Sequence, residues 1–239
     1  MGRLSTRESS RLTVNAGKAS ARKVADVGGA DASIDLYWLP LGAGGHFVRF
    51  NGHVYEAIHA RLERRRPLDL YHSALEVRVP EGRFVVENSW PIPDTNGTAR
   101  GVAVEGPVGN RRLGRFRVFR YEIRCWRDGF IADAGEAIAS PQRLSNDPVR
   151  ARRLLDLVAN VPALVWGRDE LGMGEMWNSN SVIAWLLART DLRAGEIRPP
   201  AGGRAPGWAS GLRLALSTPG PEKELLDQAK PVPLAHPPA

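Results

Sequence analysis

The sequence is short of cysteine, lysine and long apolar runs. Cys125 is the only cysteine among 239 residues, which excludes an internal disulfide and disfavours a zinc site built on cysteine. No window reaches the uninterrupted apolar length that a membrane-spanning helix needs. The polar first 27 residues lack the apolar region of a secretory signal. These absences predict a cytoplasmic protein without a membrane span.

Only four of the 33 basic residues are lysine, so arginine supplies most of the net charge of +7. The arginines are dispersed, with small clusters at 64–66, 111–117 and 150–153. They are not accompanied by the aromatic signature of an RNA-binding sheet or by zinc-finger spacing. A solvated basic surface is therefore the favoured interpretation, and nucleic-acid binding is disfavoured because it would rest on charge alone.

Length and composition predict one domain between two tails. Residues 1–30 carry no sustained periodicity and are expected to form a disordered arm, and the Pro-rich residues 217–239 form a second tail. A hydrophobic content of 43% and seven tryptophans indicate a packed core within residues 31–216. The stretch 198–216 is loop-like, although Trp208 suggests that it docks on the domain.

The order of the expected elements is typical of an α+β fold, with an antiparallel sheet packed against a buried helix. Alternation and turn signals predict strands at 35–39, 46–50, 72–79, 83–90, 101–108 and 115–126. Helical patterns and caps predict helices at 54–65, from Asn146–Pro148 to about Ala159, and at 180–189.

The helix expected at 180–189 opens with four small polar residues, Asn178 to Ser181, and is otherwise apolar on every side. It must therefore be surrounded by protein. Its N-terminus would present free N–H groups and a partial positive charge, which stabilise an oxyanion. Ser179 or Ser181 would then be a nucleophile. On spacing alone, the favoured interpretation is that Asn178 or Ser179 merely caps the helix.

A serine nucleophile needs a base, and the chain has five histidines. His236 lies in the tail, His53 and His59 fall at positions expected to be solvated, and His46 is a weaker second candidate. His72 begins a strand, and alternation places it on one face with a small alanine that leaves room for a helix. Taken alone, His72 would be a strand-edge residue satisfied by solvent.

The register of the hairpin suggests a third catalytic residue beside Ser179 and His72. If residues 80–82 form the loop, Ala74 pairs with Asn88, which puts Asn88 diagonal to His72 on one face. Asn88 is therefore the candidate to hold the imidazole, with Glu87 in reserve. Its alternative role is to end the strand.

The stretches "YHSALEV" and "WNSNSVIAWLL" resemble the circularly permuted papain-like fold of NlpC-related amidases, PPPDE peptidases and lecithin retinol acyltransferase-like enzymes. The resemblance spans roughly 45–190. Asn178 to Ser181 match the family's Asn-Cys-Asn-Ser, so Ser179 stands in place of the family cysteine. Cys125 lies in a strand pattern far from this motif and is expected to be a buried structural thiol.

The resemblance implies a hydrolase or acyltransferase acting on an amide, isopeptide or ester bond of a peptide, cell-wall fragment or acyl ester. Ser179 would attack, His72 would accept its proton and Asn88 would orient the ring. No metal or organic cofactor is implied. The residues expected around the substrate are Trp177, Asn178, Asn180 and Trp90, although packing is the favoured role for both tryptophans. The alternative is an inactive binding module on the same fold, and a third possibility is a basic nucleic-acid accessory protein.

Overall fold

The computed structural model describes residues 32–41, 61, 64, 66–91 and 101–217. The predicted arm at 1–30 and the strand at 46–50 lie outside the described residues. So do most of the helix predicted at 54–65 and the tail beyond 217.

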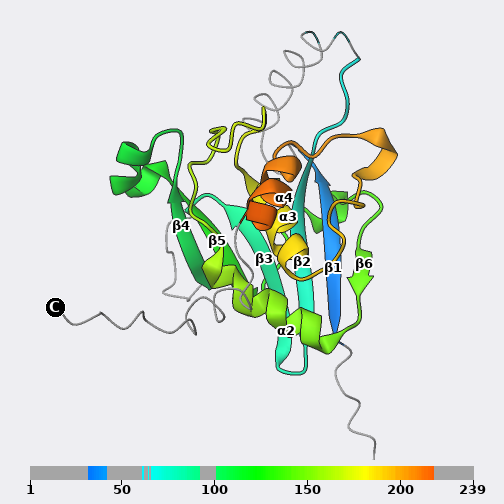
Figure 1. Cartoon of the computed structure of the whole chain (residues 1–239). Coiled ribbons are helices and arrows are strands. Elements are labelled where there is room, and N and C mark those ends of the chain that lie inside the picture. The colour runs from blue at the N-terminus through cyan, green and yellow to red at the C-terminus, as the bar shows by residue number, and fades with distance from the viewer. Residues whose placement is uncertain (1–31, 42–60, 62–63, 65, 92–100, 218–239) are drawn as a thin grey trace, which may run out of the picture.

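Six strands form one antiparallel sheet in the order β4-β5-β3-β2-β1-β6 (Figure 1). The α+β class and the antiparallel sheet predicted from the sequence are confirmed. The short edge strand β6 was not predicted. The strands are β1 (Ser33–Pro40), β2 (Tyr71–Val79), β3 (Gly82–Ser89), β4 (Val102–Pro107), β5 (Arg120–Arg127) and β6 (Gln142–Ser145).

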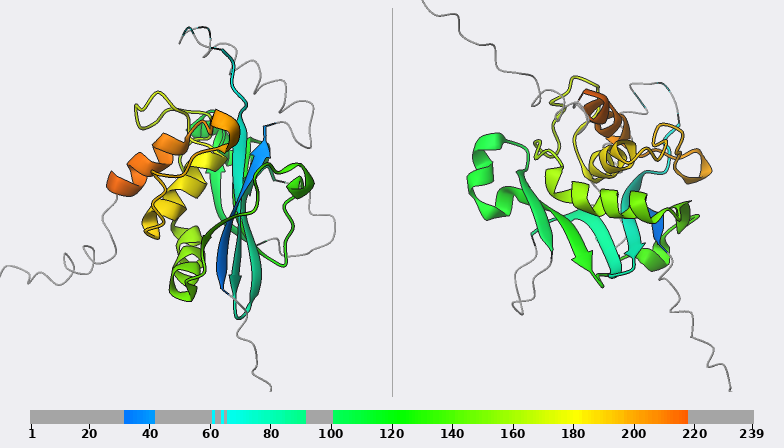
Figure 2. Two further views of the ribbon diagram at one scale, coloured as in Figure 1. Left: turned by 90° about the vertical axis from the view of Figure 1, so that its right-hand side faces the viewer. Right: turned by 60° about the horizontal axis from the view of Figure 1, so that its bottom comes forward.

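Helices α2 (Pro148–Leu157), α3 (Ser179–Arg189) and α4 (Trp208–Ser217) lie on the same face of the sheet (Figures 1 and 2). The Asp147 side chain caps α2, with proline at the first helical position as its sequence predicted. Helix α3 is apolar on all sides because the sheet, α2 and α4 surround it.

Helix α4 corrects the prediction of a loop-like stretch over 198–216. Its buried positions include Trp208, Gly211 and Ala215, which recur with helical spacing. Two of these three residues are small, so the apolar stripe was hard to see in the sequence. The small residues instead allow α4 to approach α3 closely.

The strand predicted over 115–126 is also corrected, because its first part is not extended. Two 3₁₀ turns, η1 (Arg111–Arg115) and η2 (Arg117–Phe119), precede β5. Strand β4 ends at Pro107 opposite Arg120, so the regular strand pairing stops there, and the Val108 N–H donates to the Phe119 carbonyl at 2.8 Å just beyond it. The Asn110 side chain then caps η1 by accepting the Arg112 N–H at 2.8 Å.

The main core lies between the sheet and the helices, and a smaller cluster lies on the opposite face of the sheet. That smaller cluster contains Leu39, Ala74, Val85 and Ile131. Within the described ranges, no helix is long and apolar enough to cross a membrane.

Candidate active site

Strands β2 and β3 are paired over only part of the length of β2, and the candidate site lies where their pairing stops. Pairing of β2 with β3 ends at Leu75 opposite Val86, whereas β2 continues beside β1 as far as Tyr71. At the start of β2, Arg204 supplies the backbone partner that β3 does not reach. The Arg204 carbonyl accepts the Tyr71 N–H at 2.8 Å. The start of α3 meets β2 beside this substitute segment.

The first turn of α3 is closed by a capping box. The Asn178 side chain accepts the N–H groups of Asn180 at 2.9 Å and Ser181 at 3.3 Å. The Ser181 hydroxyl accepts the Asn178 N–H at 3.1 Å and donates to the Gly207 carbonyl at 2.7 Å. Asn178 and Ser181 are therefore structural residues of the helix start.

Asn180 fixes this helix start to β2. Its Nδ2 donates to the carbonyls of Tyr71 at 2.9 Å and Pro206 at 3.0 Å, and its Oδ1 accepts the Ser73 hydroxyl at 2.8 Å. Tyr71 and Ser73 are the two neighbours of His72 in the chain. The clamp thus sets the position of α3 relative to the strand residue that the sequence predicted as the base.

Ser179 remains, and its hydroxyl lies 3.2 Å from Nδ1 of His72. The sequence left open whether these four polar residues cap the helix or take part in chemistry, and in the structure each has its own role. Asn178 and Ser181 cap the helix, Asn180 clamps it, and the buried Ser179 faces the histidine. The predicted pair of Ser179 and His72 is brought together.

His72 is held in the form that accepts a proton. Burial lowers the pKa of its imidazole to about 4, and the charge of Asp133 opposes this only in part. At neutral pH the ring is therefore uncharged. When the ring carries its proton on Nε2, Nδ1 is free to accept the Ser179 hydroxyl.

Asn88 does not take the predicted position beside His72. Val79 pairs with Gly82, so the loop has two residues instead of three and the register shifts by one. A shift of one residue exchanges the faces of a strand. Asn88 therefore lies on the opposite face from His72, and its buried amide makes no hydrogen bond with any described residue.

The same register places Glu87, the reserve candidate, on the face that carries His72. Burial raises the pKa of the Glu87 carboxyl, Arg124 lowers it and Asp133 raises it further. Oε1 of Glu87 lies 3.7 Å from Nη1 of the buried Arg124. The charge of Asp133 thus acts on both Glu87 and His72. Asp133 was not predicted from the sequence, because its segment 128–141 carries no motif that links it to β2.

The helix start retains one N–H group next to the nucleophile. The Asn178 side chain takes the N–H groups of Asn180 and Ser181, and the Asn178 carbonyl takes that of Val182 at 3.2 Å. The Ser179 N–H stays outside this cap. An oxyanion formed by attack of Ser179 would meet this donor at the positive end of α3.

The two tryptophans that were expected around the substrate, Trp177 and Trp90, have different surroundings. Trp177 is 1% exposed and belongs to the main core, so its role is packing. Trp90 is 49% exposed and its ring centroid lies 6.3 Å from that of Trp166. Cys125 lies in β5 among core residues, and burial raises the pKa of its thiol to about 11, in keeping with an unreactive structural thiol.

The segment before α4 is a further part of the site, and it was not predicted from the sequence. Pro206 accepts the side-chain amides of Asn178 and Asn180, and Gly207 accepts the Ser181 hydroxyl. Gly207 has φ +88°, and a Cβ there would lie 2.5 Å from Oδ1 of Asn178. The Pro-Gly pair was visible in the sequence as a turn signal, without any indication that it would hold the helix start.

Within the parts of the chain that the structure describes, no group of three or more His, Cys, Asp or Glu side chains is arranged to hold a metal ion. Comparison of the chain with models of protein families, with curated proteins and with solved structures found no match.

Proposed function

We propose that this protein is a serine-dependent hydrolase or acyltransferase that acts on an amide, isopeptide or ester bond. The observation that carries the proposal is the 3.2 Å separation between the Ser179 hydroxyl and Nδ1 of His72 at the N-terminus of a buried helix. Ser179 Oγ attacks the substrate carbonyl and its proton passes to Nδ1 of His72. Collapse of the tetrahedral intermediate expels the amine or alcohol, which takes that proton, and leaves an acyl-serine.

The second half of the reaction returns the enzyme to its starting state. Water, in hydrolysis, or an acceptor amine or alcohol, in transfer, attacks the acyl-serine and gives up its proton through His72. The Ser179 N–H and the partial positive charge of the helix start stabilise the oxyanion in both halves. Asn180 acts as a positioning residue, because it sets α3 against the two neighbours of His72.

The same order of parts supports a permuted papain-like fold as the finer architecture of the domain. A strand carries the histidine first, and a buried helix carries the nucleophile later in the chain. In this proposal Ser179 replaces the cysteine of the families that the sequence resembles. The substrate candidates remain a peptide, a cell-wall fragment or an acyl ester.

Burst kinetics with p-nitrophenyl acetate test the proposal. The protein is expected to release a burst of p-nitrophenol equal to its own concentration, because the acyl-serine accumulates. Ser179→Ala should lower turnover at least about a thousandfold. The matched control is Ser210→Ala, which removes another buried serine hydroxyl of the same region, one that donates to the Glu175 carbonyl at 2.9 Å.

Equal turnover by the parent and by Ser179→Ala would contradict the proposal. A folded parent that hydrolyses neither this ester nor a p-nitroanilide would instead support the non-catalytic binding module.

A further inference from the structure

The segment Arg111–Phe119, called the knob below, projects from the molecule beyond the end of β4 (Figures 1 and 2). It consists of the 3₁₀ turns η1 and η2 joined through Phe116, and neither turn contains a buried residue. The proposed reaction makes no use of this segment.

The knob exposes four large apolar side chains together. Their exposed fractions run from 38% to 72%, and Val118 is the most exposed. The four side chains are Leu113, Phe116, Val118 and Phe119. Single exposed apolar residues are ordinary on a protein surface, but a cluster within nine residues indicates an interaction site.

The same segment carries positive charge that no carboxylate of the described residues neutralises. Arg112, Arg115 and Arg117 are exposed, and no carboxylate among the described residues lies within ion-pair distance of them. The Arg115 guanidinium lies 4.6 Å from the centroid of the Phe116 ring. Guanidinium groups and apolar side chains are thus presented on one projection.

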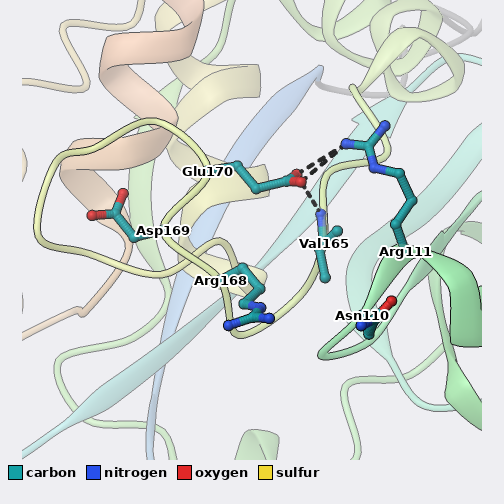
Figure 3. Close-up of a pocket in the computed structure, with 6 residues that line it drawn as sticks. All are labelled: Asn110, Arg111, Val165, Arg168, Asp169 and Glu170. Carbon is teal, nitrogen blue, oxygen red and sulfur yellow. Dashed lines mark hydrogen bonds and ion pairs between the residues drawn. The ribbon is translucent and has the colours of Figure 1, made fainter.

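The backbone of the knob is held in place by several contacts at its base. Nε of Arg120 donates to the Gly114 carbonyl at 2.6 Å, and Nη1 of Arg120 lies 2.8 Å from Oε2 of Glu105. Nη2 of Arg111 reaches Oε1 of Glu170 at 3.0 Å across a hollow of about 480 Å³, and Glu170 also accepts the Val165 N–H (Figure 3). The apolar groups are therefore exposed by a fixed backbone.

We propose that the knob binds the surface of a membrane that contains anionic lipids. The apolar side chains would enter the boundary between headgroups and acyl chains, and the three exposed arginines would contact lipid phosphates. This mode needs no membrane-spanning helix. A nucleic acid is a poorer fit, because Val118, the most exposed of the four apolar side chains, and Leu113 are aliphatic, which leaves only the two phenylalanine rings for bases to stack on.

Sedimentation of the full chain with lipid vesicles tests the proposal. The protein is expected to bind vesicles of phosphatidylcholine mixed with phosphatidylserine and to leave vesicles of pure phosphatidylcholine in solution. Val118→Glu should lower the partition coefficient roughly tenfold or more, because it places a charge at the most exposed apolar position. Its matched control is Val149→Glu on α2, since Val149 is 73% exposed, close to the 72% of Val118, and should leave binding unchanged.

The contribution of charge is tested with two triple variants of equal net charge. Replacing Arg112, Arg115 and Arg117 by glutamine should lower the partition coefficient roughly a hundredfold. Replacing Arg127, Arg153 and Arg193 by glutamine, which lie elsewhere on the surface, should lower it far less. Circular dichroism checks that every variant is folded.

Equal losses in the two triple variants would overturn the proposal, because binding would then follow net charge alone. It would also be overturned if the vesicles failed to bind the parent protein. Tight binding of a labelled single-stranded RNA that is lost in Val118→Glu would assign the knob to nucleic acid instead.

Discussion

Replacing His72 by asparagine is expected to lower kcat/KM for ester hydrolysis by about three orders of magnitude. Asparagine can still form a hydrogen bond with the Ser179 hydroxyl, but it cannot take up the proton that must leave as Ser179 attacks. The loss should therefore appear in acylation, measured as the rate of the p-nitrophenol burst. A His72→Asn protein that acylates at the rate of the parent would remove His72 from the reaction.

The parent should also show an unusual dependence on pH. The imidazole must be neutral to act as a base, and burial lowers its pKa to about 4 from a usual value of 6.5. Acylation is therefore expected to stay constant as the pH falls through 6.5 and to be lost near pH 4. A fall centred near pH 6.5 would mean that His72 is solvated.

The same burial makes the fold sensitive to acid, which the assay must control. Between pH 6.5 and pH 4 the unfolded chain binds a proton at His72 that the folded chain does not, so the free energy of unfolding decreases as the pH falls. The decrease is expected to reach roughly 3 kcal/mol at pH 4 and below. It should be smaller in His72→Asn, and thermal melts at each pH separate loss of fold from loss of base.

The second large effect is expected from Gly211→Ala in α4. A Cβ at this position would lie 2.1 Å from the Ser181 carbonyl oxygen and 2.9 Å from Cβ of Ala184, so α4 must move away from α3. Alanine favours a helix more than glycine does, but overpacking of this kind outweighs that gain. We expect a loss of about 3 kcal/mol in the free energy of unfolding.

Urea denaturation of Gly211→Ala beside Gly195→Ala checks this expectation. Gly195 has no atom within 4 Å of an added Cβ and no positive φ, so its substitution should change stability little. Since Ser181 belongs to the capping box, Gly211→Ala should also slow acylation by displacing the helix start. Equal stability of the two variants would mean that α3 and α4 do not meet as closely as described.

The elements of the candidate site were predictable because each carries a local signal. Alternation around His72 indicated β2, and the run of polar residues before Val182 indicated the start of α3. Strand β2 begins at Tyr71 and helix α3 begins at Ser179, each one residue before its predicted start. Local patterns of this kind do not depend on how distant segments meet.

The partners of these elements were not predictable in the same way. The predicted register failed at Gly82, which was assigned to the loop but pairs with Val79 at φ +142°. Because of this one-residue error, the predicted register put Asn88 on the wrong face of β3. Asn180 also donates hydrogen bonds to the carbonyls of Tyr71 and Pro206, and the first of these contacts joins residues 109 positions apart. A pattern within one segment cannot indicate such contacts.

The most direct measurement of the central claim is the site of covalent modification by a fluorophosphonate. Peptide mass spectrometry of the treated protein is expected to find one phosphonyl adduct, on Ser179, formed at neutral pH with loss of fluoride. The adduct should form at least about a thousandfold more slowly in His72→Asn, because the base is absent. Modification of a different serine, or of Ser179 at the same rate with and without His72, would contradict a serine nucleophile activated by His72.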